Sequence, residues 1–558
     1  MTLAGLRNAL INVWIFFDMW RIKFFLWDPF IRKTHQPQKI QDQLLQKIIG
    51  KNQDTQFGRA HGFDTIHSYQ SFCDAVPVHT YEDLRTYIES QENGNQPALN
   101  AEQPTMYSQT SGTTGKPKYI PVLPSTLAQY KVSQALFAWA QFSGAPGIYQ
   151  GKVLAIGSPT TEGYLATGTP YGSMSGLILE SMPTPVKLKF VVPFEVFAIT
   201  DYRLKYLLIA AFSLREPNIS LLASANPSTF LKLMDVIREN YEILVKFIAT
   251  ADPNGLEGDP GLLEIIKEIP FQPDRPRARQ LKQFLGRQKT LTYRDLWPHL
   301  RTVSTWTSGS CGVLLPRLKP LLPDPVQIIE MGYLASEFRG SLTVDAVNNR
   351  CVPTFHENFF EFVEREHWED QKKNFIRLEQ VEEGKQYYLF VTTQNGLYRY
   401  FINDIIEIGS PFNNTPTLRF IQKGKGITNL TGEKLSESQA LESLEIVGRD
   451  LKFDLDFFVL LADQERLQYT LYVELLPQTG LAGKLDEQLS IQNIEFREKL
   501  KSGRLKPTRI IFLKPGSEDA YRKYYIDRGQ REGQFKVVRL QYTKDCSFDF
   551  LPWEHPQP

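Results

Sequence analysis

Hydroxyl, glycine and lysine residues gather in one stretch, Met106–Val122, which reads MYSQTSGTTGKPKYIPV. Its short hydroxyl side chains can donate hydrogen bonds, and its glycines let the backbone turn tightly and bring N–H groups close to an anion. Lys116 and Lys118 add positive charge, and Pro117 stiffens the exit from the loop. The stretch therefore suits a polyphosphate, and the candidate phosphate-binding residues are Ser111, Gly112, Thr113, Thr114, Gly115 and Lys116.

This loop differs from the P-loop of nucleoside triphosphatases. Lys116 is followed by Pro117 rather than by Ser or Thr, and the GxxxxGK spacing is absent. A solvated turn rich in Gly, Ser and Thr is the alternative that composition alone would favour. The order of residues in TSGTTGKPK is more specific than their composition.

TSGTTGKPK resembles the phosphate loop of the acyl-adenylate-forming, firefly luciferase-like superfamily, whose members activate a carboxylate with ATP and release pyrophosphate. Further motifs resemble the Gretchen Hagen (auxin-responsive promoter) family of acyl acid–amido synthetases within it. These are MGYLASE at Met331–Glu337 and LYRYFIND at Leu397–Asp404. TQFGRAHGF at Thr55–Phe63 and VPVHTYEDL at Val76–Leu84 resemble its N-terminal signature, and GQFKVVRL at Gly533–Leu540 resembles its C-terminal one.

The resemblance implies a nucleotide site. It offers Tyr333 as the ring that stacks on adenine, Ser336 as a contact to phosphate or ribose, and Glu337 as the residue that holds Mg²⁺. A carboxylate facing ATP makes sense only if a hard cation lies between them. Asp404 is the candidate for the ribose hydroxyls. The family usually has Gly before this Asp, and Asn403 tolerates the same left-handed backbone.

The resemblance also implies two catalytic lysines. Lys118 lies at the end of the phosphate loop. Lys536 matches the position of the lysine carried by the family's C-terminal lid, which would reach the carboxylate or the α-phosphate when the lid closes. A long, flexible ammonium suits charge that develops transiently. An ordinary surface lysine is the alternative for Lys536.

The segment TVSTWTSGSCG at 302–312 leaves a predicted strand and enters a Gly/Ser turn. In the resembling family this region lies beside the activated carboxylate, so Trp306, Ser310 and Gly312 are candidates for the acyl pocket. Cys311 is a weak candidate nucleophile because no histidine base is near it in sequence. The apolar run Phe359–Phe362 resembles the family's acyl-site strand, and core packing explains it equally well.

The implied reaction is ATP-dependent activation of a carboxylic acid as an acyl-adenylate, followed by transfer of the acyl group to an amine, commonly an amino acid. ATP and Mg²⁺ are the expected cofactors. An acyl-CoA-type ligase, or a ligase for another acceptor, remains an alternative because the superfamily shares the first step. A membrane-surface ATP-binding protein without catalysis is the alternative from another class.

Composition restricts the function further. The net charge is +1, so no global field favours nucleic acid. The four cysteines form no CxxC pair and indicate free thiols in a reducing compartment, which predicts a cytoplasmic protein. The eight histidines form no HxxxH or HExxH cluster, so a zinc site is not expected.

The N-terminal segment Ala9–Trp27 reads ALINVWIFFDMWRIKFFLW, with Asp18, Arg21 and Lys23 inside it. Its uninterrupted apolar part is shorter than the roughly 20 residues that a membrane-spanning helix needs. No small-residue cleavage site follows, so a secretory signal is not expected. The segment is either a helix that docks on the protein or an interfacial helix at a membrane surface, with its basic residues snorkelling.

The pattern predicts an α/β protein with a large N-terminal domain of β-sheets flanked by helices and a small, mobile C-terminal α+β lid. We expect an aromatic N-terminal helix over 1–30, the large domain over 31–422, a hinge at 423–427 and the lid over 428–558. Strand, cap and helix succeed one another near 219–248, which argues for an α/β layer. The predicted elements include strands at 153–157 and 219–225, helices at 201–214 and 229–248, a loop at 158–176 and a connector at 252–279.

Overall fold

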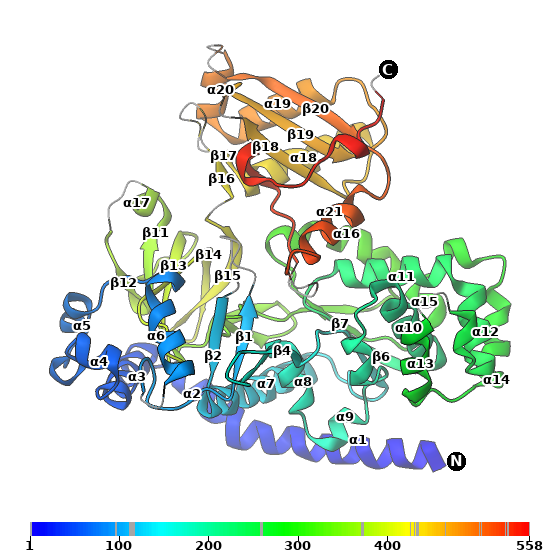
Figure 1. Ribbon diagram of the computed structural model, residues 1–558, viewed down its shortest axis with the longest axis horizontal. Helices are drawn as coiled ribbons and strands as arrows, with labels where there is room; N and C mark the ends of the chain where they lie inside the picture. Colours follow the sequence, from blue (N-terminus) through cyan, green and yellow to red (C-terminus); the bar gives the residue numbers. More distant parts are fainter. Residues whose placement is uncertain are drawn as a thin grey trace.

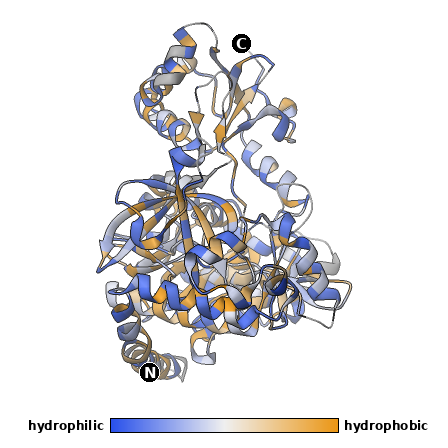
Figure 2. Ribbon diagram, turned by 90° about the vertical axis from the view of Figure 1, so that its left-hand side faces the viewer, coloured by the Kyte–Doolittle hydropathy of each residue, from blue (hydrophilic) through white to orange (hydrophobic). Residues whose placement is uncertain are grey.

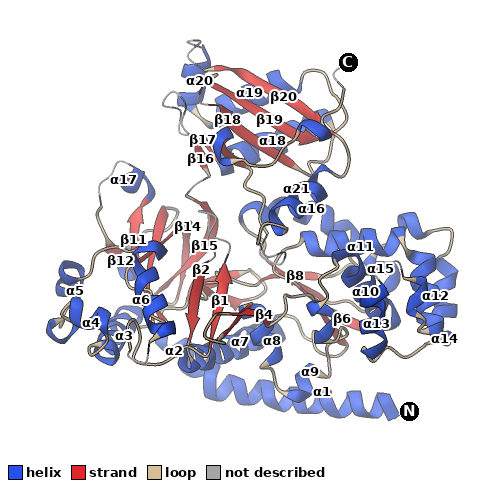
Figure 3. Cartoon of the chain, in the orientation of Figure 1, coloured by secondary structure: helices blue, strands red, loops and turns tan. Residues whose placement is uncertain are grey.

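A computed structural model gives the architecture of the chain (Figure 1). It describes residues 3–94, 97–110, 118–256, 260–369, 373–424, 426–428, 430, 433, 435–463, 465–501, 503, 505–530, 532 and 535–556. The fold is α/β, as the sequence predicts, with several sheets that helices flank (Figure 3). Apolar residues concentrate in the central strands (Figure 2).

A parallel four-stranded sheet has the order β3-β6-β7-β8. Its strands are short apolar runs buried between helices, which is typical of parallel sheets. The Asp201 side chain caps the helix that precedes β6 by accepting from the Leu204 N–H at 2.7 Å. The strands are β3 (Lys152–Ala155), β6 (Ile219–Ala223), β7 (Thr302–Thr305) and β8 (Gln327–Glu330), and the helices around them are α10 (Tyr202–Arg215), α11 (Ser228–Glu239), α12 (Tyr241–Thr250), α13 (Pro260–Glu268), α14 (Arg275–Leu281), α15 (Tyr293–Leu296) and α16 (Leu315–Leu318).

A five-stranded antiparallel sheet has the order β12-β11-β13-β14-β15 and packs against the N-terminal helices. Its strands are β11 (Asn358–Glu364), β12 (Ile376–Arg377), β13 (Gln386–Thr393), β14 (Tyr400–Phe412) and β15 (Thr415–Lys423), with the pair β9 (Ser341–Asp345) and β10 (Arg350–Pro353) before them and α17 (Arg365–Glu369) after β11. The N-terminal helices are α3 (Pro37–Asn52), α4 (Gln56–Ala60), α5 (Tyr69–Ala75) and α6 (Tyr81–Asn93).

A third sheet, β2-β1-β5-β4, carries the two flanks of the predicted phosphate loop. The strands β1 (Met106–Thr110) and β2 (Lys118–Val122) are antiparallel, with Thr110 opposite Lys118. The strands β4 (Thr161–Tyr164) and β5 (Pro170–Gly172) complete the sheet, and α7 (Pro124–Gly144) and α8 (Met174–Glu180) pack against it. The short helix α9 (Thr184–Lys187) contacts the N-terminal helix.

The C-terminal residues form a smaller α+β unit at the top of Figure 1, with its own hydrophobic core. Its sheet has the order β20-β19-β18-β21. The elements are β16 (Ile427–Thr428), β17 (Leu435–Ser436), α18 (Glu437–Leu451), β18 (Phe458–Asp463), β19 (Gln468–Glu474), α19 (Leu481–Gln492), α20 (Ile494–Lys501), β20 (Lys506–Leu513), α21 (Ser517–Ile526) and β21 (Leu540–Tyr542). The domain boundaries at 422 and 428 remain a proposal.

The N-terminal helix α1 (Leu3–Ile22) continues through a π-helical turn, η1 (Lys23–Trp27), into α2 (Asp28–Lys33). The helical run therefore ends beyond the predicted limit of residue 30. In the part of the chain that the structure describes, no helix is long and apolar enough to cross a membrane.

Three sequence predictions of local structure were wrong. The predicted helix 229–248 is two helices, α11 and α12, separated at Asn240; its N-cap is Pro227, and Asn226 accepts from the Ser228 N–H at 2.9 Å. The predicted connector 252–279 contains α13 and α14, because apolar residues such as Ile266 and Leu281 are buried in the core. The predicted loop 158–176 contains β4 and β5, which pair with each other beside β1.

Candidate active site

Residues from four distant segments meet where the two large sheets face the C-terminal unit. The ammonium of Lys536 lies 4.4 Å from the centroid of the Trp306 ring and 4.9 Å from that of Phe420. The Phe420 ring stacks with Tyr333, with centroids 5.8 Å apart and planes 11° apart. The Tyr333 hydroxyl in turn donates to Asp404 at 2.5 Å. The structure thus brings together Trp306, Tyr333, Asp404 and Lys536, which sequence motifs identified separately.

The topology explains this convergence. Trp306 follows β7 and Tyr333 follows β8, and these strands are parallel neighbours. Ligands of open α/β sheets bind beyond the carboxyl ends of such strands. Asp404 and Phe420 come from the antiparallel neighbours β14 and β15. Lys536 comes from the C-terminal unit, so the site lies between this unit and the two large sheets.

Tyr333 is held tightly in the described conformation. Its side chain is buried, at 8% exposure, and a Cβ at Gly340 would lie 2.1 Å from its Cδ1 atom. Burial, and then the charge of Asp404, raise the pKa of the Tyr333 hydroxyl well above its usual range. The phenol therefore stays protonated and donates to Asp404.

Asp404 is buried on β14, opposite Lys423. The residue before it, Asn403, has φ 58°, so it adopts the left-handed conformation that the sequence predicts for this position. The Asn403 carbonyl accepts from the Gly424 N–H at 2.9 Å. The local backbone around Asp404 is therefore tied to the start of the predicted hinge.

Glu330, at the end of β8, positions the loop that carries Trp306 and the loop that carries Tyr333. Its buried carboxylate accepts from the N–H and hydroxyl of Thr307, at 2.8 and 2.6 Å, and from the N–H of Gly332 at 3.0 Å. The Trp306 indole N–H donates to the Gly332 carbonyl at 3.1 Å. Burial raises the pKa of Glu330, and these donors oppose the effect. One carboxylate thus fixes the loops that carry Trp306 and Tyr333.

Ser336 and Glu337 lie at the tip of a tight turn. Leu334 and Arg339 form a β-bridge, and the Ala335 N–H donates to the Phe338 carbonyl at 3.0 Å. Both residues are partly exposed. The turn is fixed from outside by Asn395, whose side chain donates to the Glu337 carbonyl at 3.4 Å.

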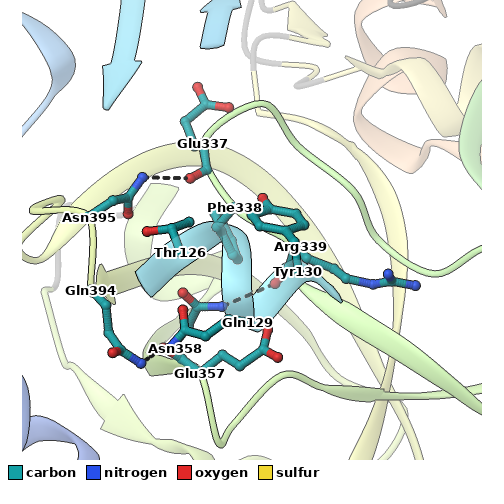
Figure 4. Close-up of a pocket in the computed structure, with 10 residues that line it drawn as sticks. All are labelled: Thr126, Gln129, Tyr130, Glu337, Phe338, Arg339, Glu357, Asn358, Gln394 and Asn395. Carbon is teal, nitrogen blue, oxygen red and sulfur yellow. Dashed lines mark hydrogen bonds between the residues drawn. The ribbon is translucent and has the colours of Figure 1, made fainter. Parts of the chain in front are cut away.

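The Glu337 carboxylate points away from the polar pocket beneath the turn (Figure 4). It interacts with the Tyr400 hydroxyl, and burial together with this carboxylate raises the pKa of Tyr400 well above its usual range. The pocket is lined by Thr126, Gln129, Tyr130, Glu337, Phe338, Arg339, Glu357, Asn358, Gln394 and Asn395. Burial lowers the pKa of Arg339 in this pocket to about 10.

Glu337 fits the requirement for Mg²⁺ in a nucleotide site. Mg²⁺ bound with a nucleotide needs one or two protein carboxylates, because phosphates and water supply its other ligands. Among the described residues, no three His, Cys, Asp or Glu side chains are grouped to hold a metal ion by themselves. Glu337 also contributes to the electrostatic field at Tyr333, together with Asp404.

The candidate phosphate-binding residues Ser111, Gly112, Thr113, Thr114, Gly115 and Lys116 lie outside the described residues. The flanking Lys118 is described: its ammonium lies 5.6 Å from the centroid of the Tyr81 ring. The Tyr81 hydroxyl accepts from the Tyr119 N–H at 2.7 Å. Tyr81 also influences Tyr400 electrostatically, so the end of the phosphate loop lies on the side of the site that carries Glu337.

The structure describes the three acyl-pocket candidates to different extents. Trp306 contacts Lys536 as described, and the side chain of Ser310 lies outside what the structure describes. Gly312 is packed so that a Cβ would lie 2.8 Å from the Thr307 carbonyl oxygen. Cys311 is buried, and burial raises the pKa of its thiol, which disfavours the thiolate that a nucleophile needs. Phe359, Phe360 and Phe362 are fully buried in the core.

Comparison with known proteins identifies the family. The chain matches the GH3 family N-terminal domain over residues 28–328, the GH3 family central domain over 351–423 and the GH3 family C-terminal domain over 440–545. The chain belongs to the GH3 family. This confirms the resemblance that the sequence motifs indicate.

Similar GH3 proteins include two from Arabidopsis thaliana. The chain is 23% identical to indole-3-acetic acid-amido synthetase GH3.3 over 533 residues, covering 90% of this chain and 89% of that protein. It is also 23% identical to 4-substituted benzoates-glutamate ligase GH3.12 over 557 residues, covering 92% and 96%. The GH3 chain is therefore related to acyl acid–amido ligases over nearly its whole length.

Solved structures agree on the fold. The GH3.15 acyl acid amido synthetase matches with a TM-score of 0.81 and 21% identity, covering 94% of this GH3 chain and 95% of the other. A 2-hydroxyisobutyryl-CoA ligase in complex with an acyl-adenylate matches with a TM-score of 0.52 and 12% identity, covering 90% and 89%. The predicted fold class is confirmed.

Sequence motifs did not identify Phe420, Glu330 or Glu437 of this GH3 chain. Phe420 stands in an ordinary strand pattern, and Glu330 ends a short apolar strand. Glu437 begins α18, where its N–H donates to the Gly426 carbonyl at 2.7 Å, and the N–H groups of Arg539 and Leu540 donate to its carboxylate. It thus connects the hinge region to the segment that carries Lys536. The one local signal is a carboxylate at a helix N-terminus.

The raised pKa of Glu437 predicts that the free energy of unfolding depends on pH. Burial raises its pKa from 4.5 to about 7. A carboxyl whose folded pKa is raised stabilises the fold below its ordinary pKa, and this contribution is lost as the pH rises from about 4.5 to about 7. We expect Glu437→Gln to remove up to about 3 kcal/mol of this dependence. Melting temperatures of both proteins at pH 5 and pH 8 measure the effect, and equal slopes with pH would contradict it.

Proposed function

We propose that the protein condenses a carboxylic acid with an amine, through an acyl-adenylate formed from ATP. The observation that carries the proposal is the contact of Lys536 with Trp306 and Phe420, next to the Tyr333–Asp404 pair. An adenylation site needs a mobile cation close to a nucleotide-binding surface, and these residues supply both. Membership of the GH3 family and the names of its amido synthetases support the same reaction.

The first step makes the acid electrophilic. A free carboxylate resists attack because its leaving group would be oxide. A carboxylate oxygen of the acid attacks the α-phosphorus of ATP, the bond from that phosphorus to the bridging oxygen breaks, and pyrophosphate leaves. The enzyme brings two anions together and stabilises the displacement, which is positioning and electrostatics rather than covalent catalysis.

Each candidate residue has a role in this step. The loop from Ser111 to Lys116, with Lys118, holds the β- and γ-phosphates. Asp404 accepts from the ribose hydroxyls, Ser336 contacts ribose or phosphate, and Tyr333 packs on the adenine. Lys536 stabilises charge on the carboxylate and α-phosphate. Glu337 is the residue that would hold Mg²⁺, which supplies positive charge to the phosphates when bound.

The second step transfers the acyl group. The amine nitrogen attacks the acyl carbon, the bond to the AMP oxygen breaks, and the nitrogen loses a proton. We infer that the C-terminal unit rotates about residues 423–427 after pyrophosphate leaves and admits the amine. An amino acid is the proposed acceptor, because relatives that match 90% and 92% of the chain carry amido synthetase and glutamate ligase names. Trp306, Ser310 and Gly312 are the proposed border of the acyl pocket.

A cytoplasmic location is part of the proposal, because ATP and reduced thiols coexist there. The four cysteines are free in the structure, which fits a reducing compartment. The names of the relatives include indole-3-acetic acid and 4-substituted benzoates, so indolic and aromatic acids are both candidate substrates.

Replacing Asp404 by asparagine tests the ribose site. The variant loses the charged acceptor of the Tyr333 hydroxyl and of the ribose. We expect the KM for ATP to rise about 10- to 100-fold, because hydrogen bonds to a charged group contribute about 1.5–3 kcal/mol. Tyr333→Phe is the matched variant, since it removes the same internal hydrogen bond and keeps the carboxylate. Equal KM values in Asp404→Asn and wild type would contradict the role of Asp404.

Pyrophosphate release with hydroxylamine as a surrogate amine tests the function. Aromatic, indolic, jasmonate-like and fatty acids are compared at fixed ATP, and amino acids and coenzyme A then replace hydroxylamine. We expect pyrophosphate only with an acid present, a hydroxamate product, and a faster second step with an amino acid than with coenzyme A. Thioester formation without amide would show the acyl-CoA alternative to be correct instead.

A further inference from the structure

The N-terminal helix is anchored to the body of the protein along one face. Ile11, Ile15, Met19 and Ile22 are buried against Trp139 of α7. The buried ammonium of Lys189 donates to the side chain of Asn8, at 2.8 Å, and to that of Asn12. The Asn12 amide donates to the Gln150 carbonyl at 3.1 Å. These contacts fix the rotation of α1, so its opposite face has a defined orientation.

That opposite face is apolar and exposed. Leu6, Leu10, Val13 and Phe17 recur with helical spacing, and Leu10 and Phe17 are 63% and 67% exposed. The π-helical turn continues the exposed surface with Phe24 and Phe25, the latter at 73%. We call this surface the apolar face; its large hydrophobic members are Leu6, Leu10, Val13, Trp14, Phe16, Phe17, Trp20, Phe24 and Phe25. Such a contiguous patch marks an interaction site in a protein that is otherwise well packed.

The charges beside the apolar face are basic. Arg7 and Arg21 are exposed and lie in one helical row with Trp14 between them. Asp18 pairs with Arg21 at 2.7 Å, but its side chain is only 13% exposed. The following helix α2 ends in the exposed residues Arg32 and Lys33. A helix with aromatic residues on one face and arginines along its border matches the interface of an anionic bilayer.

The position of α1 suits a flat partner. The helix runs along the lower edge of the molecule in Figure 1, and the C-terminal unit lies at the opposite end. A surface bound to α1 therefore leaves the proposed lid free to move. Two copies that met at this face with their helices antiparallel would bring their like-charged arginine rows together, whereas the phosphates of an anionic bilayer would neutralise these rows.

We propose that the apolar face of α1 docks on the surface of an anionic lipid bilayer, with α1 parallel to the membrane plane. The aromatic side chains enter the headgroup region, and Arg7 and Arg21 meet lipid phosphates. This docking does not require the enzymatic reaction. The binding surface lies at the end of the molecule remote from the candidate active site.

Flotation of the full-length protein with vesicles tests the proposal. One set of vesicles is phosphatidylcholine, and the other adds phosphatidylglycerol. We expect the protein to float with the anionic vesicles, with weaker binding at high salt and a blue shift of tryptophan fluorescence. Phe17→Glu and Leu10→Glu are each expected to lower the partition coefficient at least about tenfold, since they place a charge in the apolar boundary. The matched control is Leu476→Glu, which changes a residue that is 69% exposed in the C-terminal unit.

The residues replaced in these variants are exposed, and circular dichroism checks that each variant is folded. Phe17→Leu, which keeps an apolar side chain, is expected to float like the wild type. Absence of flotation of the wild type with anionic vesicles would overturn the proposal, as would equal flotation of Phe17→Glu and wild type. A wild-type dimer in light scattering that Phe17→Glu converts to a monomer, without vesicle binding, would assign the face to self-association instead.

Discussion

Lys536→Ala is expected to slow acid-dependent pyrophosphate release by about 100- to 1,000-fold, as removal of one preorganised donor to a developing negative charge does in other enzymes. The ammonium of Lys536 lies between the rings of Trp306 and Phe420, beside the Tyr333–Asp404 pair. It contributes charge to the displacement at the α-phosphorus and little to the binding of ATP alone. The loss is therefore expected in kcat, with the affinity for ATP changed by only about two- to three-fold.

Two control variants show whether the loss of activity comes from the charge of Lys536 at the site or from the loss of any lysine charge in the C-terminal unit. Lys544→Ala removes an exposed lysine of the same C-terminal unit, whose ammonium lies 5.5 Å from the Tyr542 ring, and should keep full activity. Lys536→Arg keeps the charge with a different donor geometry and should fall between alanine and wild type. A wild-type kcat in Lys536→Ala would remove this residue from the mechanism.

Glu361→Gln is expected to destabilise the large domain by about 3–5 kcal/mol, because it leaves Arg399 as a buried cation without its counter-charge. Glu361 is fully buried on β11, and its carboxylate oxygens lie 2.9–3.1 Å from the nitrogens of the Arg399 guanidinium. Arg399 also donates to the Val76 carbonyl at 3.0 Å. The pair thus holds the segment after α5 against the sheet that carries Asp404.

Urea unfolding followed by tryptophan fluorescence measures the effect of Glu361→Gln. The matched control is Glu407→Gln on the same sheet, whose exposed pair with Arg419 has an N–O distance of 2.6 Å and should contribute less than about 1 kcal/mol. Glu361→Gln combined with Arg399→Met should recover part of the loss, since both charges are then gone. Equal unfolding midpoints for Glu361→Gln and Glu407→Gln would contradict the account.

The candidate site residues were proposed from several motifs that follow one another along the chain, because no single residue identifies such a site. Tyr333, Asp404 and Lys536 are far apart in sequence. In the structure Phe420 contacts both Tyr333 and Lys536, and Tyr333 donates to Asp404. Phe420 was not predicted because an aromatic residue in a strand is normally a core residue. Glu330 was not predicted because its function is to bridge two loops, and such long-range contacts leave no local pattern.

Local structure was predicted well where burial and capping agree. The Asp201 cap and the apolar run of α10 give the helix that the periodicity indicates. The break at Asn240 was missed because the apolar pattern continues through α12, and the change of direction depends on packing against α10 and α14. The N-terminal helix docks on the protein through Ile15, which agrees with one of the two alternatives, and Phe17 faces solvent. The other alternative, an interfacial helix at a membrane surface, stays a proposal.

Exchange of labelled pyrophosphate into ATP, without an acceptor, tests the central claim most directly, because it reports the reversible formation of the acyl-adenylate. We expect exchange with the wild-type protein that requires the acid, and exchange in Lys536→Ala reduced about 100-fold or more. Acid-dependent release of ADP and phosphate without exchange, across acids that bind the protein, would show that it activates its substrate by a different reaction.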